Sequence, residues 1–351
     1  MIHVIDDFDL RVRNTFRISA KCRQWVEYTE AGDIPAVLDI IGEDTPRFHI
    51  GAGSNLLICT DNYDGAVLHS SILTHEVTPI GADMVRVTVG AGLSLDSVCQ
   101  WACESGLWGL ENLSVIPGEV GSSVVQNVGA YGCEAADLIE YAEVYDTQER
   151  RPARLYNSDL CFGYRVSLLK QPEYKGRYIV TEVAYNLSTV PAPRLDYGNL
   201  SSHFADGRNV SPMAIREVVT QVRAAKLPDP ADIGSAGSFF KNPVVSAKEW
   251  EKIQRRCVEM FGTGTEMPHY PAADGKIKLS AAWLIDHADG KTMSCGGAAV
   301  WQKQPLVLIN RTGKATYEDV LLLKDRIIDA VYGLFGVRLM PEVEIIKNIN
   351  H

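Results

Sequence analysis

The sequence has no apolar run approaching the roughly 20 residues that a membrane span needs, so we expect a soluble protein. Its N-terminus lacks both a basic leader and an apolar stretch followed by small residues. We therefore expect no secretion signal and a cytoplasmic location. The eight cysteines are scattered without a CxxC pair, unlike the dense frameworks of small secreted domains, which favours reduced thiols.

Basic residues are also in deficit: 34 Lys and Arg face 44 Asp and Glu, a formal net charge of −10. This balance argues against a general nucleic-acid-binding protein, which needs a basic surface. Cys99 and Cys103 are four residues apart, but no histidine cluster completes a ligand set, so we predict no metal. An anionic small molecule stays possible, because a few cations and backbone N–H groups can hold a diphosphate inside an acidic protein.

The length of 351 residues predicts two or three domains. One helix is predicted in the first half, over residues 94–106, with Ser94 as its N-cap. The other patterned segments of that half alternate with glycine-rich turns and predict strands, at residues 36–42, 47–53, 66–72, 85–92, 139–146 and 178–188. This order indicates an α+β fold rather than a regular βαβ alternation.

The second half is predicted to contain a separate domain of mixed helices and strands. A helix should run from Ser211 to about Ala225 and end before LPDP (227–230), where two prolines in four residues suggest a domain junction. Beyond it, a strand is predicted at residues 305–310. Two capping boxes predict helix starts on either side of that strand, at Ser246 with Glu249 and at Thr316 with Asp319.

Two glycine-rich stretches could bind an anion. In GAGSNLL (51–57), Leu56 stands where a dinucleotide fingerprint has its third glycine, so a Rossmann site is not predicted. The stretch is either an anion-binding turn or a plain strand-end turn. IPGEVGSSVVQNVGAYG (116–132) is either a loop that wraps a flat ligand and its phosphates or a long surface loop.

Five further motifs follow these two along nearly the whole chain: FGYRxSLLK (162–170), RxxKLPDP (223–230), GSAGSFFKNP (234–243), KLSAAWLID (278–286) and PEVEII (341–346). Each motif is modestly specific, but the ordered set is strongly so. In this order the chain resembles the UDP-N-acetylenolpyruvoylglucosamine reductase family.

The resemblance implies an FAD-binding fold of the vanillyl-alcohol-oxidase type joined to an α+β substrate-binding domain. The expected division is residues 1–71 for the first FAD subdomain, 72–227 with 336–351 for the second, and 228–335 for the substrate domain. The implied reaction belongs to peptidoglycan precursor synthesis, and hence to cell shape and division. NADPH reduces bound FAD, and the flavin then reduces UDP-N-acetylglucosamine enolpyruvate to UDP-N-acetylmuramate. A monomer is expected.

The resemblance also implies roles for individual residues. Ser238 matches the family's proton donor, Arg165 the contact to the substrate carboxylate, and Glu342 the residue that helps form or protonate the intermediate. The implied FAD contacts are Gly51, Ala52, Gly53, Ser54, Asn55, Leu56, Pro117, Gly118, Gly121, Ser122, Ser123, Gln126, Asn127, Gly129 and Ala130. The implied substrate contacts are Tyr131, Tyr164, Tyr197, Lys226, Asn242 and Gln304.

Three residues depart from the family pattern. Glu119 places a carboxylate in the IPGxxG stretch, Trp301 stands where histidine is usual after GGAAV, and Glu344 replaces an arginine after PEV. A carboxylate at position 119 would repel a diphosphate unless it points outward.

Two alternatives stay open. One is another FAD oxidoreductase on the same fold, such as an alcohol or sugar oxidase, which would need the flavin loops but not Ser238, Lys226 or Glu342. The other is a non-catalytic flavin-binding paralogue, which the three departures make conceivable.

Overall fold

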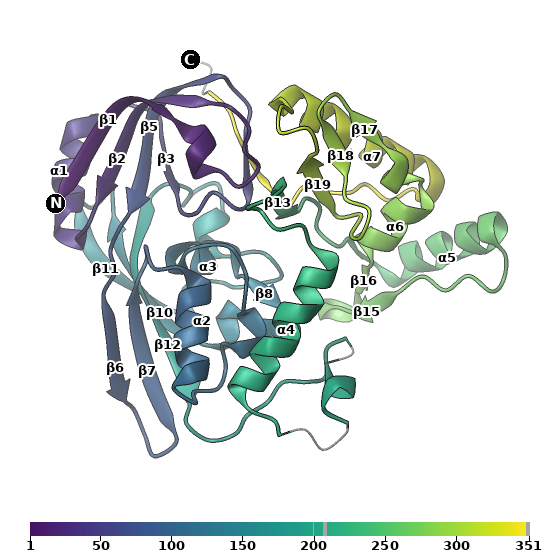
Figure 1. The fold of residues 1–351 in the computed structure, drawn as a ribbon, viewed down its shortest axis with the longest axis horizontal. Helices are drawn as coiled ribbons and strands as arrows, with labels where there is room; N and C mark the ends of the chain where they lie inside the picture. The colour runs from purple at the N-terminus through teal and green to yellow at the C-terminus, as the bar shows by residue number, and fades with distance from the viewer. Residues whose placement is uncertain (199, 206–208, 349–351) are drawn as a thin grey trace.

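The computed structural model describes residues 1–198, 200–205 and 209–348. Two sheets with their helices occupy one side of the molecule, and the C-terminal sheets with α5 to α7 occupy the other (Figure 1). The helices are α1 Ile34–Ile41, α2 Leu95–Glu104, α3 Val120–Gln126, α4 Pro212–Lys226, α5 Ala247–Phe261, α6 Ala281–His287 and α7 Tyr317–Phe335.

The N-terminal sheet has the strand order β1-β2-β5-β3, in which β5 runs parallel to both β2 and β3. Its strands are β1 Ile2–Asp9, β2 Lys21–Tyr28, β3 Arg47–Ile50 and β5 Asn62–Ser70. The strand β3 ends directly before the GAGSN turn. This sheet therefore positions the first glycine-rich stretch at its edge.

The strand predicted at residues 36–42 is wrong, because this segment forms α1. Its buried residues are spaced i, i+3, i+4 and i+7, as on one face of a helix: Ile34, Val37, Leu38 and Ile41. Pro35 lies in the first turn, and Gly42, with φ 78°, ends the helix. The β-branched composition misled the prediction, whereas the spacing was helical.

The second sheet is antiparallel throughout, with the order β11-β10-β12-β7-β6. Helices α2 and α3 share a hydrophobic core with it, and α4 lies beside α2 (Figure 1). An ion pair from Arg216 to Asp96 joins those two helices. The strands are β6 His75–Pro79, β7 Met84–Gly90, β10 Ile139–Asp146, β11 Arg151–Tyr156 and β12 Tyr178–Ser188.

The sequence predicted a continuous loop at residues 116–132, but this stretch contains the two-turn helix α3. Glu119 is its N-cap residue, and the Glu119 backbone N–H donates to Ser122 Oγ at 3.3 Å. Asn127, in a left-handed conformation with φ 45°, ends the helix. The glycines after it lead into a short hairpin of β8 Gly129–Ala130 and β9 Cys133–Glu134.

The C-terminal part combines a sheet of order β13-β19-β18-β17, a smaller sheet of order β14-β16-β15, and helices α5 to α7 around one core. The predicted capping boxes at Ser246 and Thr316 are present. Helix α6 was not predicted. The strands are β13 Gly234–Ser238, β14 Val244–Val245, β15 His269–Pro271, β16 Ile277–Leu279, β17 Ser294–Cys295, β18 Ala298–Val300 and β19 Val307–Asn310.

The C-terminal tail leaves this part and crosses back to the N-terminal side (Figure 1). Its strand β20, Glu344–Ile346, pairs in parallel with β4, Leu56–Ile58, directly after the GAGSN turn. The sequence predicts that the tail belongs with the second FAD subdomain, and the strand that β20 pairs with lies within residues 1–71. The tail thereby reaches the glycine-rich turn.

Candidate functional site

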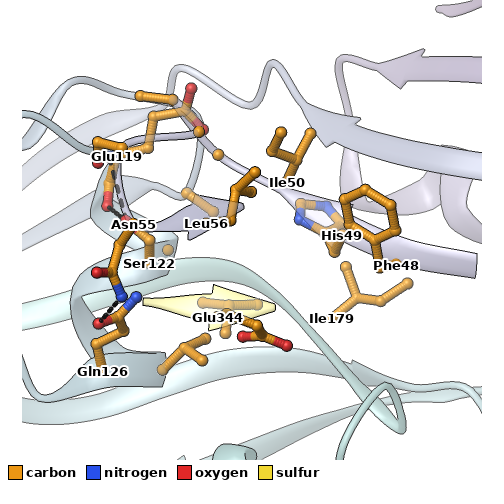
Figure 2. A pocket seen from close by; sticks show the side chains of 18 of the residues that line it. Phe48, His49, Ile50, Asn55, Leu56, Glu119, Ser122, Gln126, Ile179 and Glu344 are labelled. Carbon is orange, nitrogen blue, oxygen red and sulfur yellow. Dashed lines mark hydrogen bonds between the residues drawn. The ribbon is translucent and has the colours of Figure 1, made fainter. Parts of the chain in front are cut away.

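Two adjoining pockets lie where the glycine-rich turn, α3 and the tail meet. The larger has a volume of about 920 Å³, and Figure 2 shows it between the turn and α3 on one side and Phe48 to Ile50 and Ile179 on the other. The second has a volume of about 830 Å³. Four residues line both pockets: Ser54, Asn55, Ser122 and Gln126. The two cavities are therefore neighbouring parts of one cleft.

The turn at residues 51–55 is built to approach a ligand with its backbone. Gly53 has φ 63°, and a Cβ atom there would lie 2.0 Å from the Arg13 carbonyl oxygen, so only glycine fits. Within the described residues, the backbone N–H groups of Ala52, Gly53 and Ser54 donate no hydrogen bond. Free N–H groups in a concave turn suit the phosphate oxygens of a nucleotide cofactor.

Side chains hold this turn against the α3 segment. Ser54 Oγ donates to the Pro117 carbonyl at 2.6 Å. Asn55 Nδ2 donates to Gln126 Oε1 at 2.7 Å (Figure 2). Gly121 packs so closely on Ala91 that an added Cβ would lie 2.9 Å from the Ala91 Cβ. The two predicted glycine-rich stretches are thus joined by side-chain hydrogen bonds, and Gly121 lets α3 approach residue 91 closely.

Of the predicted cofactor contacts, thirteen line one or both pockets: Gly51, Ala52, Gly53, Ser54, Asn55, Leu56, Pro117, Gly118, Gly121, Ser122, Gln126, Gly129 and Ala130. Ser123 and Asn127 do not, because their side chains are turned into the core. The Ser123 hydroxyl is bound to the Tyr185 hydroxyl at 2.7 Å. The Asn127 amide donates to Glu134 and to the Gly163 carbonyl.

An ion pair lies in the second pocket. Arg165 Nε is 2.7 Å from Glu342 Oε1, and both side chains are largely buried, at 20% and 13% exposure. The Nε–H makes no hydrogen bond, so the contact is purely ionic. Arg165 has φ 56°, and its terminal nitrogens donate to the carbonyls of Gly129 and Asn127. The guanidinium is thereby fixed against the GAYG turn.

Backbone contacts of the tail bring Glu342 to this position. The Glu342 N–H donates to the Phe239 carbonyl at 2.8 Å, and Asn55 Nδ2 donates to the Glu342 carbonyl at 3.3 Å. Ser238 precedes Phe239 and lies at a register shift in the β13–β19 ladder. Such irregularities redirect a side chain. Ser238, Arg165 and Glu342 all line the second pocket, as the sequence prediction required of a shared site.

Among the predicted substrate contacts, Tyr164 and Asn242 lie next to this pocket. The Arg165 guanidinium lies 5.6 Å and Lys278 Nζ 4.9 Å from the centre of the Tyr164 ring. Burial raises the pKa of Tyr164, while Arg165 and a hydrogen bond with Asn242 oppose the rise. Asn242 also accepts from the Ala281 N–H at 3.0 Å. The phenol therefore stays protonated at neutral pH and is available as a hydrogen-bond donor.

Tyr131 and Tyr197 form a second contact group. Their rings meet edge-to-face with centroids 6.4 Å apart, and a Cβ on Gly132 would lie 3.0 Å from the Tyr197 Cβ. Buried Asn112 donates from Nδ2 to the Tyr131 carbonyl at 2.7 Å and to the Arg194 carbonyl at 2.9 Å. It thereby ties the GAYG turn to the segment that carries Tyr197.

Lys226 and Gln304 line neither pocket. Lys226 is exposed at the C-terminal end of α4, and its carbonyl accepts a hydrogen bond from Trp301 Nε1 at 2.9 Å. The Gln304 N–H donates to the Trp301 carbonyl, and the side-chain Oε1 is buried without a partner. The unusual Trp301 therefore links the end of α4 to the turn that carries Gln304.

Several lining residues were not predicted as site residues. In the second pocket these include Arg223, whose pKa is lowered by burial. Its place in the RxxKLPDP motif was the available signal. In the larger pocket, Glu344 forms an ion pair with Lys175 at 2.6 Å. The unpredicted wall of the larger pocket is mainly apolar, and apart from Ile346, the last residue of PEVEII, it gave no motif: Phe48, Ile50, Tyr178, Ile179, Val180 and Ile346.

None of the helices in the described ranges combines the length and apolar character that crossing a bilayer requires. Among those same residues, no three His, Cys, Asp or Glu side chains gather as a metal site would need.

Comparisons with known proteins match this geometry. A family model described as "FAD binding domain" matches residues 24–150, which include the GAGSN turn and α3. A second, described as "UDP-N-acetylenolpyruvoylglucosamine reductase, C-terminal domain", matches residues 229–346, which include Ser238 and Glu342.

Curated relatives are similar over almost the whole chain. A UDP-N-acetylenolpyruvoylglucosamine reductase of Porphyromonas gingivalis is 39% identical over 345 residues, covering 97% of this chain and 98% of the relative. One of Bacteroides fragilis is 37% identical, covering 97% and 99%. One of Chromobacterium violaceum is 39% identical, covering 96% and 97%.

The fold is shared with a solved structure of the UDP-N-acetylenolpyruvylglucosamine reductase of Thermus caldophilus. The TM-score is 0.67 at 23% identity, with 99% of each chain covered. The predicted α+β fold class, an FAD-binding fold joined to a further domain, is confirmed. The chain belongs to the UDP-N-acetylenolpyruvoylglucosamine reductase family.

Proposed function

We propose that this protein reduces UDP-N-acetylglucosamine enolpyruvate to UDP-N-acetylmuramate, with NADPH as the electron donor and FAD as the bound cofactor. Family membership supports the reaction. The observation that carries its assignment to this cleft is the Arg165–Glu342 ion pair, which shares one pocket with Ser238 and adjoins the glycine-rich turn.

The larger pocket is the proposed site of the adenosine and diphosphate part of FAD, and the second pocket is the site of its ring system. The free N–H groups of Ala52, Gly53 and Ser54 would hold phosphate oxygens. Bound FAD supplies the electron transfer from NADPH to the enolpyruvyl group. The protein's tasks are then to orient the substrate, stabilise negative charge and deliver one proton.

Arg165 is the proposed partner of the substrate carboxylate. Its ion pair with Glu342 and its bonds to two backbone carbonyls fix the guanidinium before substrate arrives, which lowers the entropic cost of orientation. A substrate carboxylate beside it would share the guanidinium with Glu342. Arg165 thereby stabilises the negative charge that develops next to that carboxylate.

Ser238 is the proposed proton donor. Within the described residues its hydroxyl has no hydrogen-bond partner, and it lines the same pocket as Arg165. A serine is a weak acid, but a nearby cation helps it transfer a proton to a strongly basic carbon. Glu342 is the proposed second acid–base group, positioned by the backbone contacts of the tail.

The remaining predicted residues form the proposed nucleotide-sugar site. Tyr164 and Asn242 would bind the substrate next to the flavin ring system. Tyr131 and Tyr197 would cover the sugar. Lys226 would supply a positive charge to the substrate diphosphate. Gln304 would bind the substrate beside Lys226. The indole N–H of Trp301 donates a hydrogen bond to the Lys226 carbonyl.

We also propose a cytoplasmic monomer that takes part in peptidoglycan synthesis and hence in cell shape and division. The domain boundaries near residues 71, 227 and 335 are proposed as well. The separate sheets on either side of 71 and 227 support the first two.

The test is to purify the chain, record its flavin absorbance, and follow NADPH oxidation with and without UDP-N-acetylglucosamine enolpyruvate. Consumption of NADPH matched by formation of UDP-N-acetylmuramate is expected. Flavin reduction without that product would contradict the proposal and favour an oxidase.

A narrower test is Ser238→Ala. Flavin reduction by NADPH should survive, while reoxidation of the flavin by the enolpyruvyl substrate should fall by about 10²-fold or more, as loss of a general acid implies. The exposed Ser158→Ala is the matched control and should change neither half-reaction. Equal loss of both half-reactions in Ser238→Ala would mean that the serine is misassigned.

A further inference from the structure

The imidazole of His69 bridges two carboxylates beside the proposed cofactor cleft. His69 Nδ1 lies 3.0 Å from Glu27 Oε2, and His69 Nε2 lies 3.0 Å from Glu119 Oε1. The side chains are 7%, 24% and 14% exposed for His69, Glu27 and Glu119, so solvent screens these contacts poorly. The three residues come from β5, β2 and the N-terminal end of α3.

An arginine and a tryptophan complete this group. Arg13 Nη2 lies 3.3 Å from Glu27 Oε2, and its guanidinium lies 4.8 Å from the centre of the Trp25 ring. That ring in turn stacks on His69 at 5.3 Å. Each His69 contact needs a proton between nitrogen and oxygen, so two ionised carboxylates require protons on both ring nitrogens. In that state the positive charges of His69 and Arg13 balance the negative charges of Glu27 and Glu119.

Glu119 stands directly at the glycine-rich turn. Ile50 pairs with His69 in the β3–β5 ladder, so the turn starts beside the imidazole. A Cβ on Gly51 would lie 3.1 Å from Glu119 Oε2. Glu119 also lines the larger pocket, at the same end as Asn55 and Ser122 (Figure 2). The sequence-based condition that Glu119 should point outward is therefore not met.

An uncompensated carboxylate here would repel a bound diphosphate, because like charges in a poorly hydrated cleft interact strongly. We propose that His69 is a positioning residue of the cofactor site: it holds Glu119 and cancels the carboxylate charge beside the diphosphate cradle. The proposal rests on the proposed function, since it takes the larger pocket as the FAD diphosphate site.

The test measures FAD binding directly, by quenching of flavin fluorescence on titration of the FAD-free protein, at low and at high salt. His69→Gln should weaken FAD binding at least tenfold at low salt. The loss should stay nearly the same at high salt, because mobile ions screen largely buried charges poorly. Adding Glu119→Gln to the His69→Gln chain removes the carboxylate charge that has lost its partner. The double variant should therefore recover most of the lost FAD affinity.

Recovery in the double variant separates charge compensation from packing. A double variant as weak as His69→Gln, or a His69→Gln that binds FAD as tightly as wild type, overturns the proposal. If His69→Gln does not fold, Glu119→Gln alone decides. It should bind FAD at least as tightly as wild type, and a tenfold weakening overturns the proposal. A wild-type chain that binds no FAD would instead contradict the proposed function.

Discussion

Arg165 and Glu342 neutralise each other across 2.7 Å, although one follows the GAYG hairpin and the other lies in the C-terminal tail. Neither residue has another counter-ion among the ion pairs of the described chain. Removing either charge therefore leaves the other largely buried and unpaired, which is costly. The pair links chemistry at the pocket to the docking of the tail.

The first prediction concerns Glu342→Gln, which keeps the shape of the side chain and removes its acid–base capacity. Product formation should fall by about 10² to 10⁴-fold, the usual contribution of a general acid or base. Flavin reduction by NADPH should persist, because that step needs no proton from this residue. Rapid-mixing absorbance of the two half-reactions measures this, with Glu251→Gln on exposed α5 as the control. Unchanged flavin reoxidation would contradict the assigned role.

The second prediction concerns the glycine-rich turn. Gly53→Ala should abolish FAD binding, because its Cβ would lie 2.0 Å from the Arg13 carbonyl oxygen at φ 63°. Gly81→Ala is the matched control, since no atom lies within 4 Å of a Cβ at that turn. Flavin absorbance of the purified proteins distinguishes them. A yellow, FAD-loaded Gly53→Ala protein would show that the turn does not hold the cofactor.

The third prediction concerns Asn112, which donates to the carbonyls of Tyr131 and Arg194. Asn112→Ala should raise KM for the enolpyruvyl substrate severalfold while flavin reduction by NADPH changes little, because both proposed tyrosine contacts lose their anchor. Steady-state kinetics with varied enolpyruvyl substrate measures the change in KM.

Asn157→Ala is the control for loss of stability alone. Asn157 likewise donates to two carbonyls, of Ala136 and Ile139, both at 2.8 Å. It should lower the melting temperature without changing KM. If the two variants shift KM equally, Asn112 has only a structural role.

The fourth prediction concerns pH and stability. The Arg177 guanidinium holds the pKa of buried Asp146 below its usual range. A lowered pKa contributes stability that is present above the unfolded pKa, about 4 for aspartate, and is lost as pH falls through the folded value. Asp146→Asn should therefore lower the free energy of unfolding at pH 7 by about 1 to 3 kcal/mol.

The deficit of Asp146→Asn should shrink as pH falls below about 4, because Asp146 becomes protonated first in the unfolded chain and then, at still lower pH, in the folded one. Urea unfolding at pH 7 and below about pH 4 gives the deficit in unfolding free energy under each condition. The exposed Asp83→Asn is the control. A deficit that is the same at both pH values would exclude the ion pair as its cause.

The sequence predicted the parts of this structure that local chemistry determines. Ser94 caps its helix as predicted, because a side-chain oxygen three residues before a free N–H is a local signal. Helix α4 also begins directly after Ser211, where the sequence predicted a helix start. The segment 36–42 failed because its apolar residues fit a buried strand by composition and a helix only by spacing. Ser123 was grouped with the cofactor contacts by motif, yet its neighbour across the fold, Tyr185, binds the hydroxyl.

The candidate site was predictable as a set of motifs but not as a geometry. The ion pair of Arg165 with Glu342 and the bridge from His69 to Glu119 join segments far apart in the chain, which no local pattern reports. Glu119 illustrates the limit: the sequence shows a carboxylate out of place, whereas the proposed compensation comes from His69, 50 residues away in the chain.

The pairing of β20 with β4 has a consequence for the order in which the cleft forms during translation. Translation runs from the N-terminus, so the segments of the cleft before residue 342 are made before Glu342 can reach Arg165. A nascent chain that stops before Glu342 therefore has the glycine-rich turn but lacks the carboxylate that we propose for catalysis. Under the proposed function, substrate reduction becomes possible only after the segment that contains Glu342 and β20 has been translated.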